Sequence, residues 1–314
     1  MVMSEALTDL RRAAATIAPH LRRTPILRSS IDTVDGPREV VFKLEYLQLG
    51  GCFKVRGSLW ATLHARARGE LSDAGVLVAS GGNAAIGAAW AARIAGVPCA
   101  VVVPENAPVV KVETLRGLGA TVHLVGRRYQ DAADAAVELA ASSGALLLHA
   151  YDLPDVVTGA GTIGLELAED VPGPLTTVAC VGGGGLLAGL AAALRPGDRA
   201  IGAEPVGASC LHQALAAGEP VTVELDSVAA DSLGATRVGD ICWNAVAGNP
   251  AVESVTVTDD DLIAARRMLW DSHRILVEHG TAAALAAVTT GAVPVHEGST
   301  LCVVLCGANT GLGI

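Results

Sequence analysis

The chain has 314 residues, a length that allows one large domain or two of moderate size, with a core that needs no disulfide or metal to stabilise it. Its 22 basic and 32 acidic residues give a net charge of −10, which argues against a nucleic-acid partner, because such proteins carry a basic surface. Charged residues make up only 17% of the chain and apolar residues 51%, so long disordered segments are not expected.

Cysteine spacing and hydropathy argue against an extracellular or membrane protein. The seven cysteines are odd in number and form no C-x-x-C pair, so neither a zinc site nor a disulfide framework is predicted. The longest uncharged window, residues 175–194, is long enough to span a bilayer, but four consecutive glycines divide it into a strand-like and a helix-like half. The N-terminus lacks the apolar segment of a signal peptide. We therefore expect a soluble cytoplasmic protein with no membrane partner.

An amphipathic helix is predicted at the N-terminus, capped by Ser4 and stopped before Pro25. A strand over residues 39–47 and a helix over residues 53–70, closed by Gly69, follow. From residue 75 onward, short apolar strands alternate with longer helices, which is typical of βαβ units and a parallel sheet. The predicted order is strand 75–80, helix 84–96, strand 98–104, helix 107–119, strand 120–125, helix 131–144 and strand 145–150.

A second alternating series follows and is interrupted by a loop-rich stretch that ends at Asn249, after which Thr258 is expected to cap a helix. Two such series predict an α/β fold of two domains, each a mostly parallel sheet flanked by helices, with the ligand site in the cleft between them. The other elements of this series are helix 158–170, strand 176–181, helix 185–194, strand 199–204, strand 252–258, helix 281–291 and strand 300–307.

Four consecutive glycines, Gly182–Gly185, lie between a predicted buried strand and a helix N-terminus. Glycines let the backbone approach a phosphate closely, and the helix end supplies free N–H groups and a positive dipole. One matching ligand is a dinucleotide, because Gly183, Gly185 and Ala188 satisfy G-x-G-x-x-A and Glu204 ends the next strand. The other is the phosphate of a smaller cofactor, and tight helix packing is the interpretation without a ligand.

Two further loops also follow predicted strands. Residues 80–83 present backbone N–H groups suited to a carboxylate, and Asn83 adds a side-chain donor and acceptor. Residues 306–309 follow the final strand. Each of these two loops is equally compatible with an ordinary turn.

Lysine is scarce, since only three of the 22 basic residues are lysines: Lys43, Lys54 and Lys111. Arginine occupies the other basic positions. A lysine that remains is therefore a candidate for chemistry, because an amine forms a Schiff base and a guanidinium does not.

Five segments in order carry a resemblance to a known family: FKLEYLQLGGCFKVRGS, ASGGNAAIGAAWAARIAGVP, CVGGGGLLAGLAAAL, the Ala-Glu-Pro at 203–205, and VVLCGAN. They resemble the fold type II pyridoxal-phosphate enzymes, in particular the serine/threonine dehydratases and their serine dehydratase-like branch. The resemblance covers nearly the whole chain. It implies a fold like that of the tryptophan synthase β subunit, with a large cofactor-binding domain of residues 1–49 and 152–314. Residues 50–151 would form a small domain that carries Lys54 and the substrate loop.

The resemblance also implies roles for individual residues. Lys54 would hold pyridoxal 5'-phosphate as an internal aldimine and then serve as acid and base at the substrate α-carbon. Phe53 and Ser232 would lie on the two faces of the cofactor ring, Asn83 would bind the ring hydroxyl, and Cys306 would face the pyridine nitrogen. The cofactor phosphate would lie on Gly182, Gly183, Gly184, Gly185 and Leu186. The substrate carboxylate would lie on Ser80, Gly81, Gly82, Asn83 and Ala84.

The activity implied is elimination of water from a small β-hydroxy amino acid such as L-serine or L-threonine, giving a 2-oxo acid and ammonia. A neutral thiol at Cys306 cannot form the ion pair with the ring nitrogen that an aspartate would, which favours elimination over transamination. Gly81 stands where racemising relatives carry a proton-donating serine, so racemisation is disfavoured. Cys52 stands where the family usually has serine, and Ala84 replaces the histidine common in biosynthetic threonine dehydratases.

Some relatives bind a monovalent or divalent cation beside the phosphate loop. The resemblance would place its ligands at Glu204 and at the carbonyl groups of Ala208, Leu233 and Ala235. The next expected oxygen ligand falls at Cys210, a poor partner for a hard cation, so a bound cation and its absence both stay open. A homodimer is the expected assembly, since it is common in the family.

Three other functions stay open at this point. The chain could be another pyridoxal-phosphate lyase, or a β-replacement enzyme acting on a β-substituted amino acid. It could be an NAD-dependent oxidoreductase that uses the Gly182–Gly185 loop with Glu204. It could also be a catalytically silent ligand-binding relative, which retention of Lys54 in a lysine-poor chain disfavours. His273 and the pair Glu278–His279 lack metalloprotease spacing, and ordinary surface or core histidines explain them.

Overall fold

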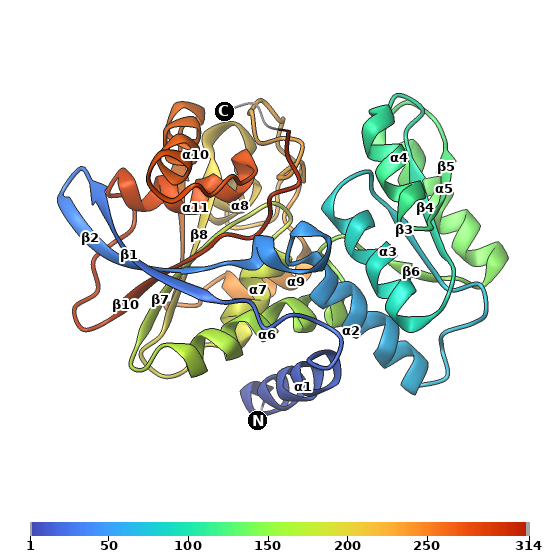
Figure 1. Ribbon diagram of the computed structural model, residues 1–314, viewed down its shortest axis with the longest axis horizontal. Coiled ribbons are helices and arrows are strands. Elements are labelled where there is room, and N and C mark those ends of the chain that lie inside the picture. The colour runs from blue at the N-terminus through green and yellow to red at the C-terminus, as the bar shows by residue number, and fades with distance from the viewer. Residues whose placement is uncertain (1, 312–314) are drawn as a thin grey trace.

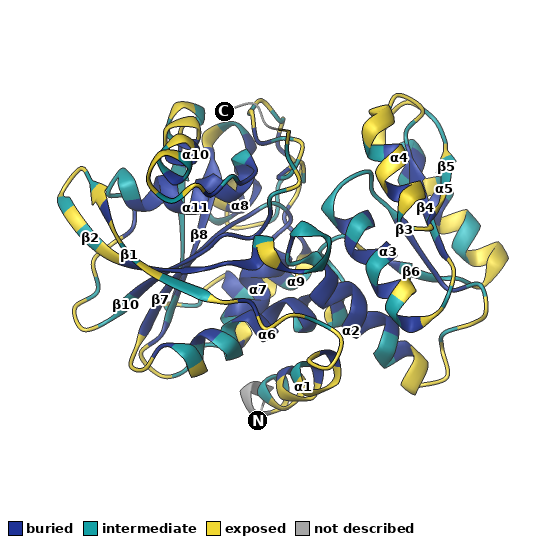
Figure 2. Cartoon of the chain, viewed as in Figure 1, coloured by how far each residue is buried: buried dark blue, intermediate teal, exposed yellow. Residues whose placement is uncertain are grey.

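The computed structural model describes residues 2–311, which form two β-sheets with helices packed on them (Figure 1). The larger sheet has six strands, of which only the pair β1–β2 is antiparallel. Its central strand β7 is buried along its whole length, as expected for a parallel strand covered on both faces (Figure 2). In spatial order the strands are β1 (Ile26–Thr33), β2 (Gly36–Lys43), β10 (Thr300–Val304), β7 (Leu175–Cys180), β8 (Arg199–Pro205) and β9 (Val252–Val257).

The smaller sheet has four strands and is entirely parallel. Alanines of α3 and α5 pack on its opposite faces, because a parallel sheet needs helices on both sides. In spatial order the strands are β5 (Thr121–Leu124), β4 (Cys99–Val103), β3 (Val76–Ala79) and β6 (Leu146–Leu148). The connecting helices are α3 (Asn83–Ala95), α4 (Val109–Gly117) and α5 (Tyr129–Ser143).

Helix α2 (Lys54–Ala67) runs between the two sheets and packs on α3 and on α6 (Pro154–Asp170) (Figure 1). Glycines make this close packing possible. A Cβ atom at Gly57 would lie 2.5 Å from the Val156 carbonyl oxygen, and one at Gly159 would lie 2.5 Å from that of Arg56. The backbone that carries Lys54 is therefore fixed against α6.

The predicted α/β fold with two mostly parallel sheets is confirmed, and three local predictions are wrong. Helix α1 (Val2–Ile17) begins before Ser4, which therefore does not cap it. Strand β1 was not predicted, because its alternating polar residues resemble a loop. The loop-rich stretch contains helices α8 (Cys210–Ala217) and α9 (Asp240–Val246).

The remaining elements agree with the sequence analysis. The Thr258 side chain accepts a hydrogen bond from the Asp261 N–H and caps α10 (Asp259–His273), as predicted. Helices α7 (Gly185–Ala192) and α11 (His279–Thr289) follow the predicted pattern. Within residues 2–311, no helix is both long and apolar enough to cross a membrane. The domain boundaries at residues 49/50 and 151/152 stay a prediction.

Candidate active site

The loop before α2 is joined to the segment that leaves β10. The Phe53 N–H donates to the Cys306 carbonyl oxygen at 3.0 Å, and the Ala308 N–H donates to that of Gly51 at 2.9 Å. Cys52 and Gly307 form an isolated antiparallel bridge. Lys54 is thereby brought to the carboxyl end of the larger sheet, the edge at which ligands bind in open α/β folds.

Lys54 is the first residue of α2, and its amine lies in a site without a carboxylate partner among the described residues. Its Nζ atom donates to the Ala150 carbonyl oxygen at 2.7 Å and lies 4.9 Å from the centre of the Phe53 ring. Burial lowers the pKa of the Lys54 amine below its ordinary value. The neutral amine is the form that acts as a nucleophile or base.

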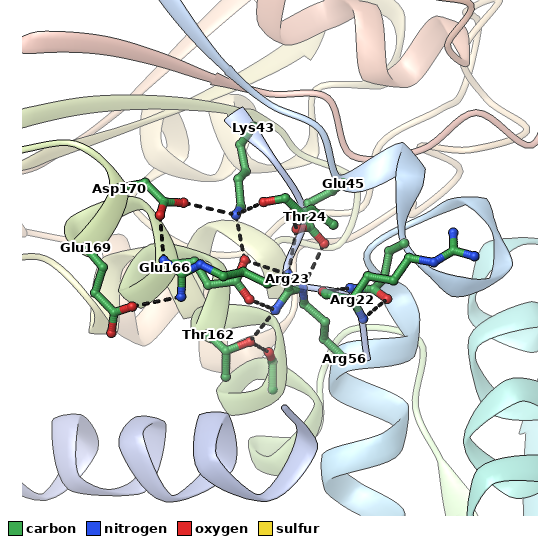
Figure 3. Close-up of polar contacts among 12 residues, drawn as sticks. Arg22, Arg23, Thr24, Lys43, Glu45, Arg56, Thr162, Glu166, Glu169 and Asp170 are labelled. Atoms are coloured by element: carbon green, nitrogen blue, oxygen red, sulfur yellow. Dashed lines mark hydrogen bonds and ion pairs between the residues drawn. The ribbon is translucent and has the colours of Figure 1, made fainter. Parts of the chain in front are cut away.

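The other two lysines differ from Lys54. The Lys43 Nζ atom is fully buried and lies 2.5 Å from a Glu166 carboxylate oxygen and 2.7 Å from the Thr24 carbonyl oxygen (Figure 3). Lys111 lies on α4 and lines a cavity of about 460 Å³. Lys43 is therefore a charged structural group, and only Lys54 combines burial with a missing counter-charge.

Three of the four glycines at 182–185 are required by packing. A Cβ atom at Gly183 would lie 2.2 Å from the Tyr151 ring, one at Gly184 would lie 2.3 Å from Cys242 Sγ, and one at Gly185 would lie 2.6 Å from the Tyr151 carbonyl oxygen. Gly182 has room, since its nearest neighbour would be 3.4 Å away. Packing therefore explains more of this loop than the sequence analysis assumed.

The same loop nevertheless fits a phosphate. Within residues 2–311, the N–H groups of Gly182, Gly183 and Gly184 have no hydrogen-bond acceptor, and α7 begins directly after them. Three free N–H groups followed by the N-terminus of a helix form an anion-binding arrangement. Leu186 is the second residue of this helix and is buried.

Asn83 is held by the carboxylate of Glu278, a residue that the sequence analysis considered only for metalloprotease spacing and gave no role in the site. The Asn83 Nδ2 atom donates to both Glu278 carboxylate oxygens at 2.9 Å, and its Oδ1 atom accepts from Asn309 Nδ2 at 2.7 Å. Glu278 is 4% exposed, and burial raises its pKa. An acidic residue directly before an alanine-rich helix that contains no Asp, Glu, Lys or Arg was the available indication in the sequence.

The cavity of about 460 Å³ joins this group to the predicted substrate loop. Among its lining residues are Gly81, Gly82, Asn83, Lys111, Ser232 and Glu278. Ser80 and Ala84 lie next to the lining residues in the chain, and Ser80 Oγ accepts from the Gly82 N–H at 3.2 Å. Lys54 does not line this cavity. A second cavity, of about 470 Å³, lies where β7 and β10 begin and contains none of the predicted site residues.

Cys306 and Ser232 lie at the N-terminal end of α11. Cys306 is buried, and its Sγ atom lies 3.1 Å from Thr281 Oγ1 and 3.2 Å from Cys180 Sγ. Ser232 Oγ donates to the Ala229 carbonyl oxygen at 3.3 Å and packs against Gly280, where a Cβ atom would lie 2.4 Å from it.

The predicted cation site has an unsuitable donor set. Glu204 is fully buried, and its carboxylate accepts from the N–H groups of Leu211 at 2.9 Å and His212 at 2.8 Å, at the start of α8. Burial raises the pKa of Glu204 to about 7. Cys210 donates its thiol proton to the Gly182 carbonyl oxygen at 3.2 Å.

Hard cations prefer several ionised or carbonyl oxygens. In residues 2–311 no group of three or more His, Cys, Asp or Glu side chains is arranged to hold a metal. A thiol beside a single carboxylate, which already accepts two backbone N–H groups, is therefore a poor donor set for such an ion. The carbonyl groups of Ala208, Leu233 and Ala235 do not supply the missing side-chain charge, and we assign no role to a cation.

A buried network of charged groups holds the start of α2 (Figure 3). Arg56 donates to Glu45 through two contacts of 2.8 Å, and to Glu166 at 2.7 and 3.0 Å. Lys43 contacts the same Glu166 carboxylate. The network ties α2, the segment before it and α6 together two residues after Lys54.

Comparisons with known proteins agree with this geometry. A family model described as "Pyridoxal-phosphate dependent enzyme" matches residues 17–307. Serine racemase of Oryza sativa subsp. indica is 34% identical, over 98% of this chain and 91% of the relative. L-threonine ammonia-lyase of Geobacter sulfurreducens is 36% identical, over 96% of this chain and 75% of the relative. The crystal structure of serine racemase from Dictyostelium discoideum superimposes with a TM-score of 0.87 at 30% identity, over 98% of this chain and 99% of that one.

These matches show which cofactor the family uses. A pyridoxal-phosphate family model over residues 17–307 argues against an NAD-dependent oxidoreductase, whereas binding of the cofactor phosphate by Gly182–Gly185 stays a prediction. The chain belongs to the family of pyridoxal-phosphate dependent enzymes, with the fold type II architecture.

Proposed function

We propose that the chain eliminates water from a small β-hydroxy amino acid such as L-serine or L-threonine and releases a 2-oxo acid and ammonia. The observation that carries the proposal is the asymmetry of its proton-transfer groups. Lys54 supplies one amine of lowered pKa, while Gly81 supplies no side chain in the substrate loop. One base is enough to remove the α-proton for elimination, whereas racemisation also needs an acid on the opposite face.

The residues present fit the cofactor of the family. When bound, pyridoxal phosphate supplies an electron sink that makes the substrate α-proton acidic. We propose that Lys54 holds its aldehyde carbon, that the free N–H groups of residues 182–186 hold its phosphate, and that Asn83 meets the ring hydroxyl. Phe53 and Ser232 would cover the ring faces, and Cys306 would meet the ring nitrogen.

Lys54 moves the proton at the α-carbon. Its amine donates one hydrogen bond to the Ala150 carbonyl oxygen, which holds the nitrogen in place. Because burial favours the uncharged amine, Lys54 needs no neighbouring base to activate it.

The substrate loop orients the amino acid. The N–H groups of residues 80–84 lie where β3 ends and α3 begins, and such N–H groups favour a carboxylate. Gly81 has space for a side chain, since a Cβ atom there would lie 3.5 Å from Val103 Cγ1. Lack of space therefore does not explain why the loop has no hydroxyl at position 81.

Serine racemisation is the second candidate, because serine racemases are among the similar proteins at comparable identity. Ser232 is a hydroxyl that lines the cavity, but its proton is directed at the Ala229 carbonyl oxygen. β-Replacement on a β-substituted amino acid would use the same groups as elimination. A homodimer and a cytoplasmic location stay predictions.

The test is the product ratio from L-serine and L-threonine. We expect 2-oxo acid and ammonia with little D-isomer, and weak activity on D-serine, measured by a coupled keto-acid assay and chiral chromatography. Gly81→Ser should raise the share of D-isomer, while Gly82→Ser, which adds the same hydroxyl one residue later, should not. D-serine as the main product of the parent protein would overturn the proposal in favour of racemisation.

A further inference from the structure

Two thiols and one hydroxyl from three separate elements meet at the base of the candidate site. Cys180 ends β7, Cys306 follows β10, and Thr281 lies in α11. All three side chains are at most 6% exposed. Cys180 Sγ lies 3.2 Å from Cys306 Sγ, which lies 3.1 Å from Thr281 Oγ1, so the three form one hydrogen-bonded chain.

The proton of Thr281 fixes the direction of this chain. Thr281 Oγ1 donates to the Gly307 carbonyl oxygen at 2.9 Å and accepts from the Gly307 N–H at 3.1 Å. A hydroxyl has one proton and two acceptor positions, and a carbonyl oxygen is a stronger acceptor than sulfur. The Thr281 proton is therefore directed at Gly307, and the contact with Cys306 requires the thiol to donate to Thr281.

Because Cys306 has one proton and donates it to Thr281, its sulfur can only accept a hydrogen bond from Cys180. Cys180 must then donate to Cys306 Sγ. Its hydrogen bond to Cys306 and its burial both raise the pKa of Cys180, so it keeps the proton that it donates. Each proton in the chain thus has one acceptor.

We propose that Cys180 and Thr281 are positioning residues for Cys306, in a chain that runs from Cys180 to Cys306 to Thr281 to the Gly307 carbonyl oxygen. The assignment of Cys306 to the cofactor ring nitrogen rests on the proposed function, whereas the direction of the chain does not. Cys306 is held as a neutral thiol whose proton points away from the cleft. A protonated ring nitrogen would therefore be buried against an uncharged sulfur, which disfavours that charge.

The direction can be tested by infrared difference spectroscopy of the S–H stretching bands in the full-length chain, before and after addition of pyridoxal phosphate. A band moves to higher frequency when its thiol loses its acceptor. Thr281→Val should shift the Cys306 band, and Cys306→Ala should shift the Cys180 band. Cys180→Ala should remove the Cys180 band and leave the frequency of the Cys306 band unchanged, because the Cys306 thiol still donates to the Thr281 oxygen.

Two variants serve as matched controls. Thr281→Ser keeps the hydroxyl and should keep the parent spectrum, which separates the hydrogen bond from the shape of the side chain. Cys302→Ala removes a buried thiol on β10 whose hydrogen bond goes to the Thr300 carbonyl oxygen and to none of the three groups, and it should leave both bands unshifted.

A chain of opposite direction would give the opposite pattern, with the Cys306 band shifted by Cys180→Ala and unmoved by Thr281→Val. That result would overturn the proposal, and the Cys180→Ala spectrum alone decides it if Thr281→Val does not fold.

With cofactor bound, Thr281→Val should also shift the visible absorbance maximum, while Thr281→Ser should not. If the absorbance maximum does not shift although Lys54 is still labelled by the cofactor, the positioning role is wrong and the proposed function stands. If Lys54 carries no label at all, the proposed function itself is contradicted.

Discussion

Two buried clusters of ionisable groups lie within a few residues of each other along α2, and their electrostatics differ. Around Arg56 every buried charge contacts an opposite charge: Arg56 pairs with Glu45 and Glu166, and Lys43 pairs with Glu166 (Figure 3). In the candidate site Lys54 contacts a carbonyl oxygen.

The acidic group of the site shows the same contrast. Glu278 contacts the amides of Asn83 and Asn309 in place of a positive charge. Burial lowers the pKa of Lys54 and raises the pKa of Glu278, so both shifts favour the neutral form of the group. A buried charge with a partner stabilises a fold, whereas a buried ionisable group without one is available to transfer protons.

The largest effect should come from removing the unpaired lysine of the candidate site. Lys54→Ala should lower turnover by about 10³-fold or more, because it removes both the nucleophile and the base. Lys111→Ala should keep the reaction and serves as the matched control. Steady-state assays of 2-oxo acid release compare the variants. Turnover of Lys54→Ala near that of the parent protein would show that the unpaired amine is not the reacting group.

The paired cluster should affect stability instead. Arg56→Met leaves Glu45 and Glu166 buried beside fewer positive charges, which should lower the free energy of unfolding by about 3–5 kcal/mol. Adding Glu45→Gln should recover part of the loss, since it removes one uncompensated charge. Urea unfolding followed by circular dichroism measures both. A loss below about 1 kcal/mol for Arg56→Met would mean that the network does not hold α2 in place.

Glu204 extends the comparison to pH. Its folded pKa of about 7 lies above the ordinary value of 4.5, so the folded state binds more protons than the unfolded state between these values. This carboxyl group therefore stabilises the fold fully below about pH 4.5, and its contribution falls by about 3 kcal/mol as the pH rises to 7. Glu204→Gln should make the free energy of unfolding less dependent on pH over this range, measured by urea titrations at several pH values. An unchanged pH dependence would contradict the assignment.

The smallest effect is expected at the exposed end of the charged network. Arg23 contacts Glu169 and Asp170, but its side chain is 52% exposed. Exposed ion pairs contribute about 0–1 kcal/mol, so Arg23→Ala should change the free energy of unfolding by no more than that. The same urea assay measures the effect. If Arg23→Ala lowers the free energy of unfolding by more than this, burial does not explain the difference between the Arg56 and Arg23 ion pairs.

The sequence predicted the strands and helices well where hydrophobic periodicity was strong. The scarcity of lysine made Lys43, Lys54 and Lys111 equal candidates, and only the family resemblance singled out Lys54. It failed at β1, whose polar alternation became a strand only by pairing with β2. Helices α8 and α9 are short and were hidden among turn-forming residues.

The polar partners in the site could not be predicted, because long stretches of chain separate them. Glu278 lies 195 positions from Asn83, and Cys180 lies 126 from Cys306. Periodicity describes neighbours along the chain and carries no information about which distant side chains meet. The glycines at 183–185 show a related limit, since the sequence offered packing and phosphate binding as alternatives, whereas in the structure packing requires these glycines and the loop still fits a phosphate.

The lysine that reacts with the cofactor can be identified directly by labelling. Incubation of the full-length chain with pyridoxal phosphate, reduction with borohydride and peptide mapping should place the pyridoxyl label on Lys54 alone. Lys43 should stay unlabelled because its amine is buried against Glu166, and Lys111 because it lies on α4, away from the phosphate loop at the start of α7. A label on Lys43 or Lys111, with Lys54 free, would contradict the claim that the unpaired buried amine is the reactive one.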